Sequence, residues 1–128
     1  YAHSLLKQFK GEWEYNTDWK MINGHPKKAG WINAIQEAQK TVQKGISLDC
    51  PVLVMSSNKS FPETKEWNNE YLSSDIVLDV HDIQKYGQKL GNYVTRDTIQ
   101  NGIHDLILSE KDSRDHVYRT VFDWLPGK

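Results

Sequence analysis

The chain has 128 residues, 38% of them hydrophobic, which is long enough for one domain with a modest core and too short for two. Sixteen basic and seventeen acidic residues give a net charge of −1, with no run of like charge longer than Lys27-Lys28, so the chain lacks the clustered cations that nucleic acids and anionic membranes attract. The longest apolar run, residues 52–55, is far below the ~20 residues of a membrane span, and no transmembrane segment is predicted.

The N-terminal third contains one clear helical pattern. Residues 2–9 predict a short helix that ends at Gly11, and residues 12–24 alternate aromatic with polar residues, as a strand or an aromatic-rich loop would. Residues 29–44 predict a longer helix that ends at Gly45. Its apolar stripe consists of Trp31, Ile32, Ile35, Ala38 and Val42.

Two strands and a helix are predicted next. Residues 51–57 hold a continuous apolar run, which indicates a strand buried on both faces of a parallel sheet. Residues 58–74 form a long connection, in which Pro62 to Trp67 favours a helical turn. Residues 79–90 predict a helix with Val80, Ile83, Tyr86, Gly87 and Leu90 facing inward and Gly91 as its cap, and residues 93–99 predict the second strand.

A helix after the second strand completes the predicted pattern. Asp112 and Ser113 are typical of a helix N-cap, and Pro126-Gly127 of a stop. The helix between them has Val117, Val121, Trp124 and Leu125 on one face. Strand, helix, strand, helix is the order of an α/β unit in which a crossover helix joins two parallel strands.

Ligand-handling residues of such sheets lie in loops beyond the carboxyl ends of the strands. Asp75 and His104 are expected in such loops, and a histidine whose second nitrogen contacts a carboxylate can act as a general base. Asp79 and Asp82 stand where a helix begins, so capping competes with a catalytic role. Asp105 is expected to make local backbone hydrogen bonds.

The remaining candidates point to no further chemistry. Ser60 and Ser109 lack the strained turn that exposes a hydrolase serine, and no G-x-S-x-G motif occurs. Cys50 is interpreted as an inert buried thiol, and a lone cysteine favours a reducing, cytoplasmic setting. Neither a metal nor a cofactor is expected, since no metal-ligand spacing relates His3, His25, His81 and His116. Substrate-pocket and packing roles both remain open for Trp13, Tyr15, Trp19 and Trp31.

Three segments together resemble the C-terminal part of an α/β-hydrolase. They are Cys50 to Ser57, the run Ser74-Asp75-Ile76-Val77-Leu78-Asp79-Val80, and the stretch from Val94 to Ser109 that contains Gly102-Ile103-His104-Asp105. The group that they resemble most comprises the serine aminopeptidase, lysophospholipase and monoacylglycerol-lipase-like hydrolases. By this resemblance, residues 1–48 would be the end of the cap region plus a helix, and residues 49–128 the C-terminal βαβα segment of a single domain.

The resemblance implies a divided active site. His104 matches the family's base and Asp75 its acid, with Asp79 as the second choice, because residues 58–74 intervene where the family has a short loop and put Asn58 and Ser60 at the acid's usual place. The nucleophilic serine would lie upstream of Tyr1. The implied reaction is hydrolysis of a small-molecule ester or amide through an acyl-enzyme, and the chain alone is expected to be inactive.

A different class of function is also open. The chain would then be a non-catalytic α/β module that binds a protein partner or a small apolar ligand through its aromatic N-terminal half. In either case, a strand at residues 51–57 without a neighbour on one side would expose an edge, which predicts self-association into a homo-oligomer.

Overall fold

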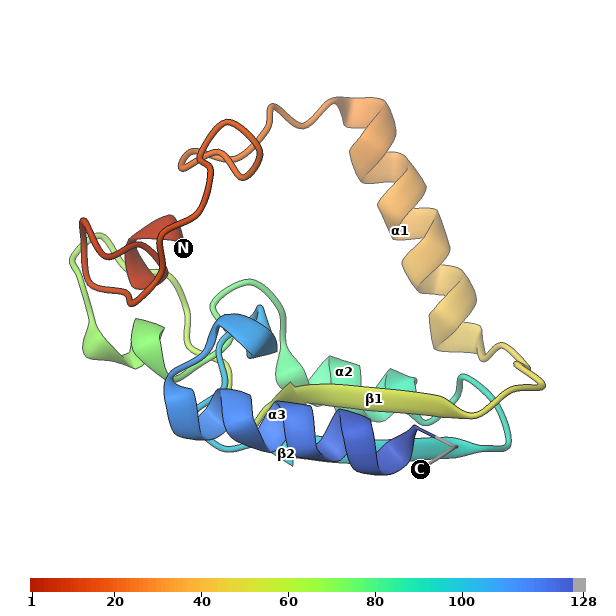
Figure 1. The fold of residues 1–128 in the computed structure, drawn as a ribbon. Helices are drawn as coiled ribbons and strands as arrows, with labels where there is room; N and C mark the ends of the chain where they lie inside the picture. Colours follow the sequence, from red (N-terminus) through yellow and green to blue (C-terminus); the bar gives the residue numbers. More distant parts are fainter. Residues whose placement is uncertain (126–128) are drawn as a thin grey trace.

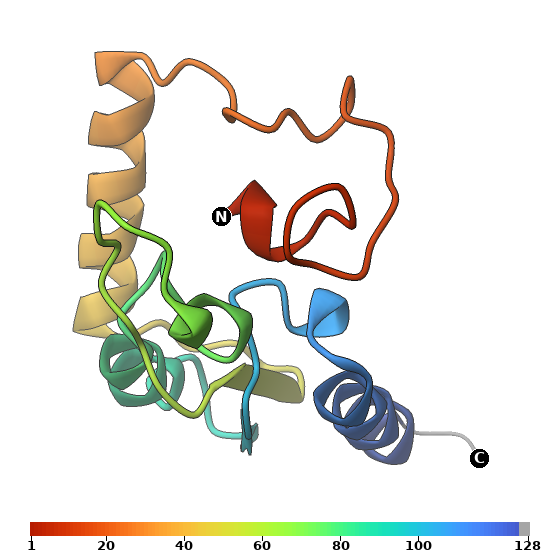
Figure 2. The same cartoon turned by 90° about the vertical axis from the view of Figure 1, so that its left-hand side faces the viewer.

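Two parallel strands form the centre of the fold. In the computed structural model, which describes residues 1–125, β1 (Val52–Ser57) pairs with β2 (Val94–Ile99) in a register that runs from Val52↔Val94 to Ser57↔Ile99. Helix α2 (Val80–Gly87) covers one face of the pair and α3 (Lys111–Trp124) the other (Figures 1 and 2). The predicted α/β class, with two parallel strands and flanking helices, is therefore confirmed.

The alternation of side chains along the strands explains this arrangement. Val54 points to α2, where a Cβ added to Gly87 would lie only 2.8 Å from its Cγ1. Asp97 points to the opposite face, where its carboxylate accepts a hydrogen bond from the Thr120 hydroxyl of α3 at 2.6 Å. Successive residues of a strand face opposite sides of the sheet, so one pair of strands seats both helices.

The expectation that β1 is buried on both faces is wrong. Residues 52–55 are only partly buried, and Ser56 and Ser57 alone are fully buried. Among residues 1–125, β1 pairs with β2 and with no further strand, so one of its edges has no partner. A continuous apolar run is typical of the interior of a larger parallel sheet, and here it lies at an edge.

The helix boundaries correct several cap predictions. Asp79 caps α2 as expected, since its carboxylate accepts the His81 N–H at 2.8 Å. The helix ends at Gly87 rather than continuing to Gly91, which instead forms an isolated bridge with Leu48. Helix α3 begins after Glu110, and Ser113 is not its cap but donates to the carbonyl of Gln100 at 2.7 Å.

The end of the chain leaves one prediction without a test. Helix α3 ends at Trp124, close to where the sequence predicts a stop. The residues that predict this stop, Pro126 and Gly127, lie outside the described residues. Within the described part, no helix combines the length and the apolar character that crossing a membrane requires.

The N-terminal segment folds as a closed turn rather than as the predicted helix. Only η1 (Ala2–Ser4) is helical, and Trp13 returns to the chain start, donating its backbone N–H to Leu5 at 2.8 Å. A Cβ on Gly11 would lie 2.1 Å from the Leu5 carbonyl, so only glycine permits this approach. Residues 12–24 run as turns around a single isolated bridge, so the loop alternative is correct.

Helix α1 (Ala29–Lys44) has the predicted bounds but stands apart from the sheet (Figure 1). None of its residues is buried, and Trp31 is 55% exposed. A groove of about 370 Å³ separates its apolar side, at Ile35 and Val42, from α2. The amphipathic pattern therefore predicts the helix correctly, and its apolar stripe is exposed.

The buried apolar core is small and lies toward the carboxyl ends of the strands. It combines Leu5 and Leu6 of the N-terminal turn, Ile99 at the end of β2, Ile103 in the following loop and Val117 of α3, each at most 4% exposed. The Trp13 indole N–H adds a tie between these segments by donating to the Leu108 carbonyl at 2.8 Å. The best-packed part of the molecule thus surrounds the loop that carries His104.

Candidate active site

Asp75 returns to the end of β1 despite the long connection before it. Its backbone forms an isolated parallel bridge with Ser60, in which the Asp75 N–H donates to Lys59 at 3.0 Å and the Asp75 carbonyl accepts from Phe61 at 2.9 Å. The intervening residues leave the sheet and come back, so Asp75 occupies the position of a residue directly after the strand. This excursion contains η2 (Asn69–Leu72) in place of the predicted helical turn at 62–67.

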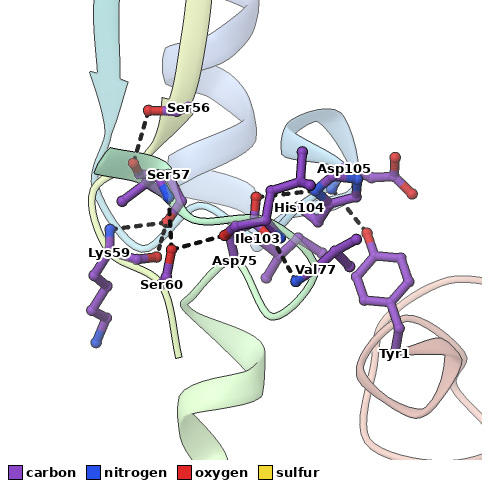
Figure 3. Close-up of polar contacts among 12 residues, drawn as sticks. Tyr1, Ser56, Ser57, Lys59, Ser60, Asp75, Val77, Ile103, His104 and Asp105 are labelled. Carbon is purple, nitrogen blue, oxygen red and sulfur yellow. Dashed lines mark hydrogen bonds and ion pairs between the residues drawn. The ribbon is translucent and has the colours of Figure 1, made fainter. Parts of the chain in front are cut away.

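The Asp75 carboxylate is held on both oxygens. Oδ1 accepts the backbone N–H groups of Val77 and Leu78, each at 2.8 Å. Oδ2 lies 3.0 Å from Nδ1 of His104, and Figure 3 marks this contact with a dashed line. The side chain is 3% exposed, so these three bonds replace its contact with water. A buried carboxylate that is held in this way can fix the orientation of the imidazole ring that it contacts.

His104 lies in a tight loop after β2. Asn101 adopts a left-handed backbone conformation, with φ of 54°, and donates its N–H to the side-chain oxygen of Asn58 at 3.0 Å. The next bonds run from the Gly102 N–H to Ile99 at 3.2 Å and from the Ile103 N–H to the Ser109 hydroxyl at 3.0 Å. Asn58, which follows β1, thus links the ends of the two strands and brings the Asp75 and His104 loops together.

The second ring nitrogen of His104 is available for chemistry. A carboxylate can only accept, so Nδ1 is the donor in this bond, and in the neutral ring Nε2 is then the acceptor. No residue among 1–125 forms a hydrogen bond with Nε2, and the side chain is 29% exposed. His104 lines a cavity of about 800 Å³ whose wall includes Tyr15, Trp19 and Val77. The geometry is that of a general base facing a space of ligand size.

The other acidic candidates have separate roles. Asp79 is the N-cap of α2 and Asp82 lies in its first turn, beside the groove that faces α1. Asp105 makes one local backbone hydrogen bond, through its main-chain carbonyl, which accepts the Leu108 N–H at 2.8 Å, while its carboxylate forms an ion pair with Lys20. Of the four carboxylates weighed from the sequence, Asp75 is the one that the structure joins to His104 by a hydrogen bond.

The aromatic residues divide between the two roles left open. Trp13 packs, with its indole bonded to Leu108 and its ring 4.7 Å from the Arg114 guanidinium. Tyr15 and Trp19 line the cavity beside His104, and the Tyr15 hydroxyl is buried without a hydrogen-bond partner among residues 1–125. Packing and pocket therefore apply to different members of the group, while Trp31 of α1 is 55% exposed and lines none of the cavities described for residues 1–125.

The three side chains considered as nucleophiles, Ser60, Ser109 and Cys50, form no contact with His104 in the bonds described for residues 1–125. Ser60 donates to the Leu78 carbonyl and accepts the Val80 N–H, both at 2.8 Å. The Ser109 hydroxyl is occupied by the Ile103 N–H. Cys50 is exposed rather than buried, which corrects the prediction for it, and it precedes β1. Within residues 1–125, no group of three or more His, Cys, Asp or Glu residues is arranged to hold a metal ion.

Sequence reasoning missed two residues of the site. Tyr1 accepts the Asp105 N–H on its hydroxyl at 2.9 Å, and Lys20 pairs with the Asp105 carboxylate. They lie 104 and 85 positions from Asp105, respectively, and no local motif signals such distant contacts.

No protein-family model, curated protein or solved structure matches the chain. The resemblance to α/β-hydrolases therefore stays a prediction, and a functional proposal depends on the geometry of the His104 site.

Proposed function

We propose that this chain is the C-terminal portion of a serine hydrolase of the α/β-hydrolase type and supplies the acid and base of its active site. The observation that carries the proposal is the hydrogen bond from His104 to Asp75, with Asp75 buried and His104 among the residues that line a cavity. The nucleophilic serine comes from a polypeptide segment outside these residues. The cytoplasmic setting stays a prediction from the lone Cys50.

The chemistry assigned to the two residues follows from their bonds. Asp75 holds the His104 ring with its proton on Nδ1 and stabilises the imidazolium that forms during the reaction. Nε2 takes the proton of the serine hydroxyl as the serine oxygen attacks the carbonyl carbon of an ester or amide. The same proton then passes to the leaving alcohol or amine, and an acyl-enzyme remains for water to hydrolyse in a second round.

The first test concerns the isolated chain. It should not hydrolyse a p-nitrophenyl ester above the rate in buffer, because it contributes a base and no activated nucleophile. Turnover by the isolated chain that disappears in His104→Ala would contradict the division of the site.

The second test concerns the parent protein. The reading frame upstream of Tyr1 should encode a strand, a G-x-S-x-G turn and a helix, and the full-length product should hydrolyse acyl esters. Replacing His104 by Ala or Asp75 by Asn should then lower kcat by about 10³ or more. Asp79→Asn, at the exposed cap of α2, serves as the matched carboxylate control and should leave kcat within about threefold. Absence of the upstream motif would overturn the proposal.

A binding role without catalysis is the second candidate. The exposed apolar stripe of α1, with Trp31 at 55% and Ile35 at 39% exposure, and the groove between α1 and α2 favour it. Such a module would bind an apolar ligand or a protein partner through α1 and would tolerate the loss of His104. Unchanged biological activity of a His104→Ala variant would favour this role over the hydrolase.

A further inference from the structure

Two side chains from the N-terminal segment hold the turn that carries His104. The Tyr1 hydroxyl accepts the Asp105 N–H, and Lys20 binds the Asp105 carboxylate. The Tyr1 ring also stands edge-on to the His104 imidazole, with 6.0 Å between ring centroids (Figure 3). The residue that follows His104 is thus tied through its main chain and its side chain to a segment at the opposite end of the sequence.

The Lys20 cation stabilises the ionised Asp105 carboxylate and lies close to the ring of Tyr1. Lys20 Nζ lies 5.6 Å from the centroid of the Tyr1 ring while it pairs with Asp105. Burial alone would raise the pKa of the Asp105 carboxyl, but Lys20, together with Tyr1 and His104, holds the pKa below its usual range. Burial raises the pKa of the Tyr1 hydroxyl, so it stays protonated and neutral. An ionised Asp105 and a neutral Tyr1 therefore persist across the physiological pH range.

The backbone on the other side of His104 is fixed independently. The Ile103 N–H bonds to the Ser109 hydroxyl, and both residues are at most 2% exposed. With Ile103 held in the core, the orientation of the imidazole depends on where residue 105 is held. Tyr1 and Lys20 supply that second anchor and also line the cavity that His104 faces.

We propose that Tyr1 and Lys20 are positioning residues for His104, which keep its Nδ1 on Asp75 and its Nε2 directed at the cavity. This inference rests on the proposed function, because it assigns to the N-terminal segment the alignment of the proposed base.

The experiment is NMR of the uniformly ¹⁵N-labelled chain. In the unmodified protein, His104 should carry its proton on Nδ1, with a downfield, slowly exchanging N–H resonance. In Tyr1→Phe, which keeps the ring and removes the hydroxyl, the Asp105 amide should exchange about tenfold faster because it loses its acceptor, and the His104 Nδ1–H resonance should weaken. In Lys20→Met and in the double variant, the Nδ1–H resonance should weaken and a second population with the proton on Nε2 should appear.

Two controls separate positioning from general loosening. Lys20→Arg retains a cation for Asp105 and should restore the His104 spectrum. Lys7→Met removes another lysine of the same segment, whose side chain pairs with Glu14 at 3.8 Å rather than with Asp105, and it should leave the spectrum unchanged. If the double variant unfolds by circular dichroism, the two single variants decide the outcome.

The outcomes distinguish this proposal from the hydrolase proposal. An unmodified protein with the Nδ1–H signature, together with variants that keep it while Asp105 exchanges faster, would overturn the positioning role and leave the proposed function standing. An unmodified protein that lacks the signature would contradict the bond between His104 and Asp75, and with it both proposals.

Discussion

At the scale of single residues, Asp75 serves the loop and the histidine at once. One oxygen accepts two backbone N–H groups from the residues that lead into α2, and the other binds His104. Leaving a buried polar group without its hydrogen-bond partner costs more free energy than forming one such bond contributes to stability. The same carboxylate therefore shapes the loop and orients the proposed base.

Replacing Asp75 tests the structural part of this role. Asp75→Ala leaves the N–H groups of Val77 and Leu78 without their acceptor and should lower the free energy of unfolding by about 2–4 kcal/mol. Asp75→Asn should cost less than half as much, since its amide oxygen can still accept both bonds. Urea denaturation measures the difference. Asp79→Ala, an exposed cap worth about 1 kcal/mol, is the reference, and a cost for Asp75→Ala no larger than this would contradict the assignment.

Asp97 predicts how stability depends on pH. The hydrogen bond from the Thr120 hydroxyl, followed by the Thr98 N–H and His116, holds the pKa of Asp97 below its usual range, although burial opposes this. Because the folded-state pKa lies below the unfolded value of about 3.9, ionised Asp97 stabilises the fold fully above that value. This contribution disappears as the pH falls through the folded-state pKa.

Unfolding experiments across that window check the prediction. Asp97→Asn should be less stable than the unmodified protein at pH 7, and the difference should shrink as the pH falls below about 4. Thr120→Val removes the principal donor and should itself reduce the pH dependence. A difference that stays constant from neutral to acidic pH would show that Asp97 does not link protonation to folding.

At the scale of elements, two helical glycines lie in opposite environments. Gly87 faces Val54 so closely that a Cβ would lie 2.8 Å from its Cγ1, while a Cβ on Gly30 in α1 would meet no atom within 4 Å. The close approach of α2 to β1 therefore requires glycine, whereas α1 carries Gly30 without a packing reason.

The two alanine substitutions should act in opposite directions. Gly30→Ala should stabilise the protein by about 0.5–1 kcal/mol through helix propensity. Gly87→Ala should destabilise it by about 1–2 kcal/mol, because overpacking exceeds the same gain. Thermal unfolding measures both. Adding Val54→Ala to Gly87→Ala should recover part of the loss, and a stabilising Gly87→Ala would mean that α2 does not pack closely on β1.

At the scale of the whole molecule, the free edge of β1 predicts self-association. The Val52 and Asn58 N–H groups donate to Tyr93 and Ile99 carbonyls, so even-numbered amides point to β2 and odd-numbered amides point to the free edge. A neutral, apolar edge without lysine lacks the usual protection against pairing. We expect association that increases with concentration in analytical ultracentrifugation.

Proline substitutions separate the two edges of β1. Leu53→Pro removes an amide from the free edge and should reduce association while α2 and α3 remain folded by circular dichroism. Val54→Pro is the matched control, because it removes an amide that faces β2 and should unfold the sheet. An unmodified chain that sediments as a monomer at high concentration would contradict the predicted self-association.

Local patterns predicted the parts of this molecule that depend on neighbouring residues. The 3.6-residue period predicted the bounds of α1, an apolar run predicted β1, and Asp79 was expected as a cap because its partner is two residues away. Local patterns also failed where distant contacts compete with propensity, as at residues 2–9, where Trp13 pairs with the chain start.

The sequence by itself determined that an α/β unit would carry Asp75 and His104 in loops after its strands. Only the tertiary structure decided that they meet, because the bridge from Ser60 to Asp75 must first close a long excursion. It also decided that Tyr1 and Lys20 hold the histidine turn. The physical reason is that periodicity and caps report interactions within a few residues, whereas contacts between distant segments depend on the packing of the whole chain.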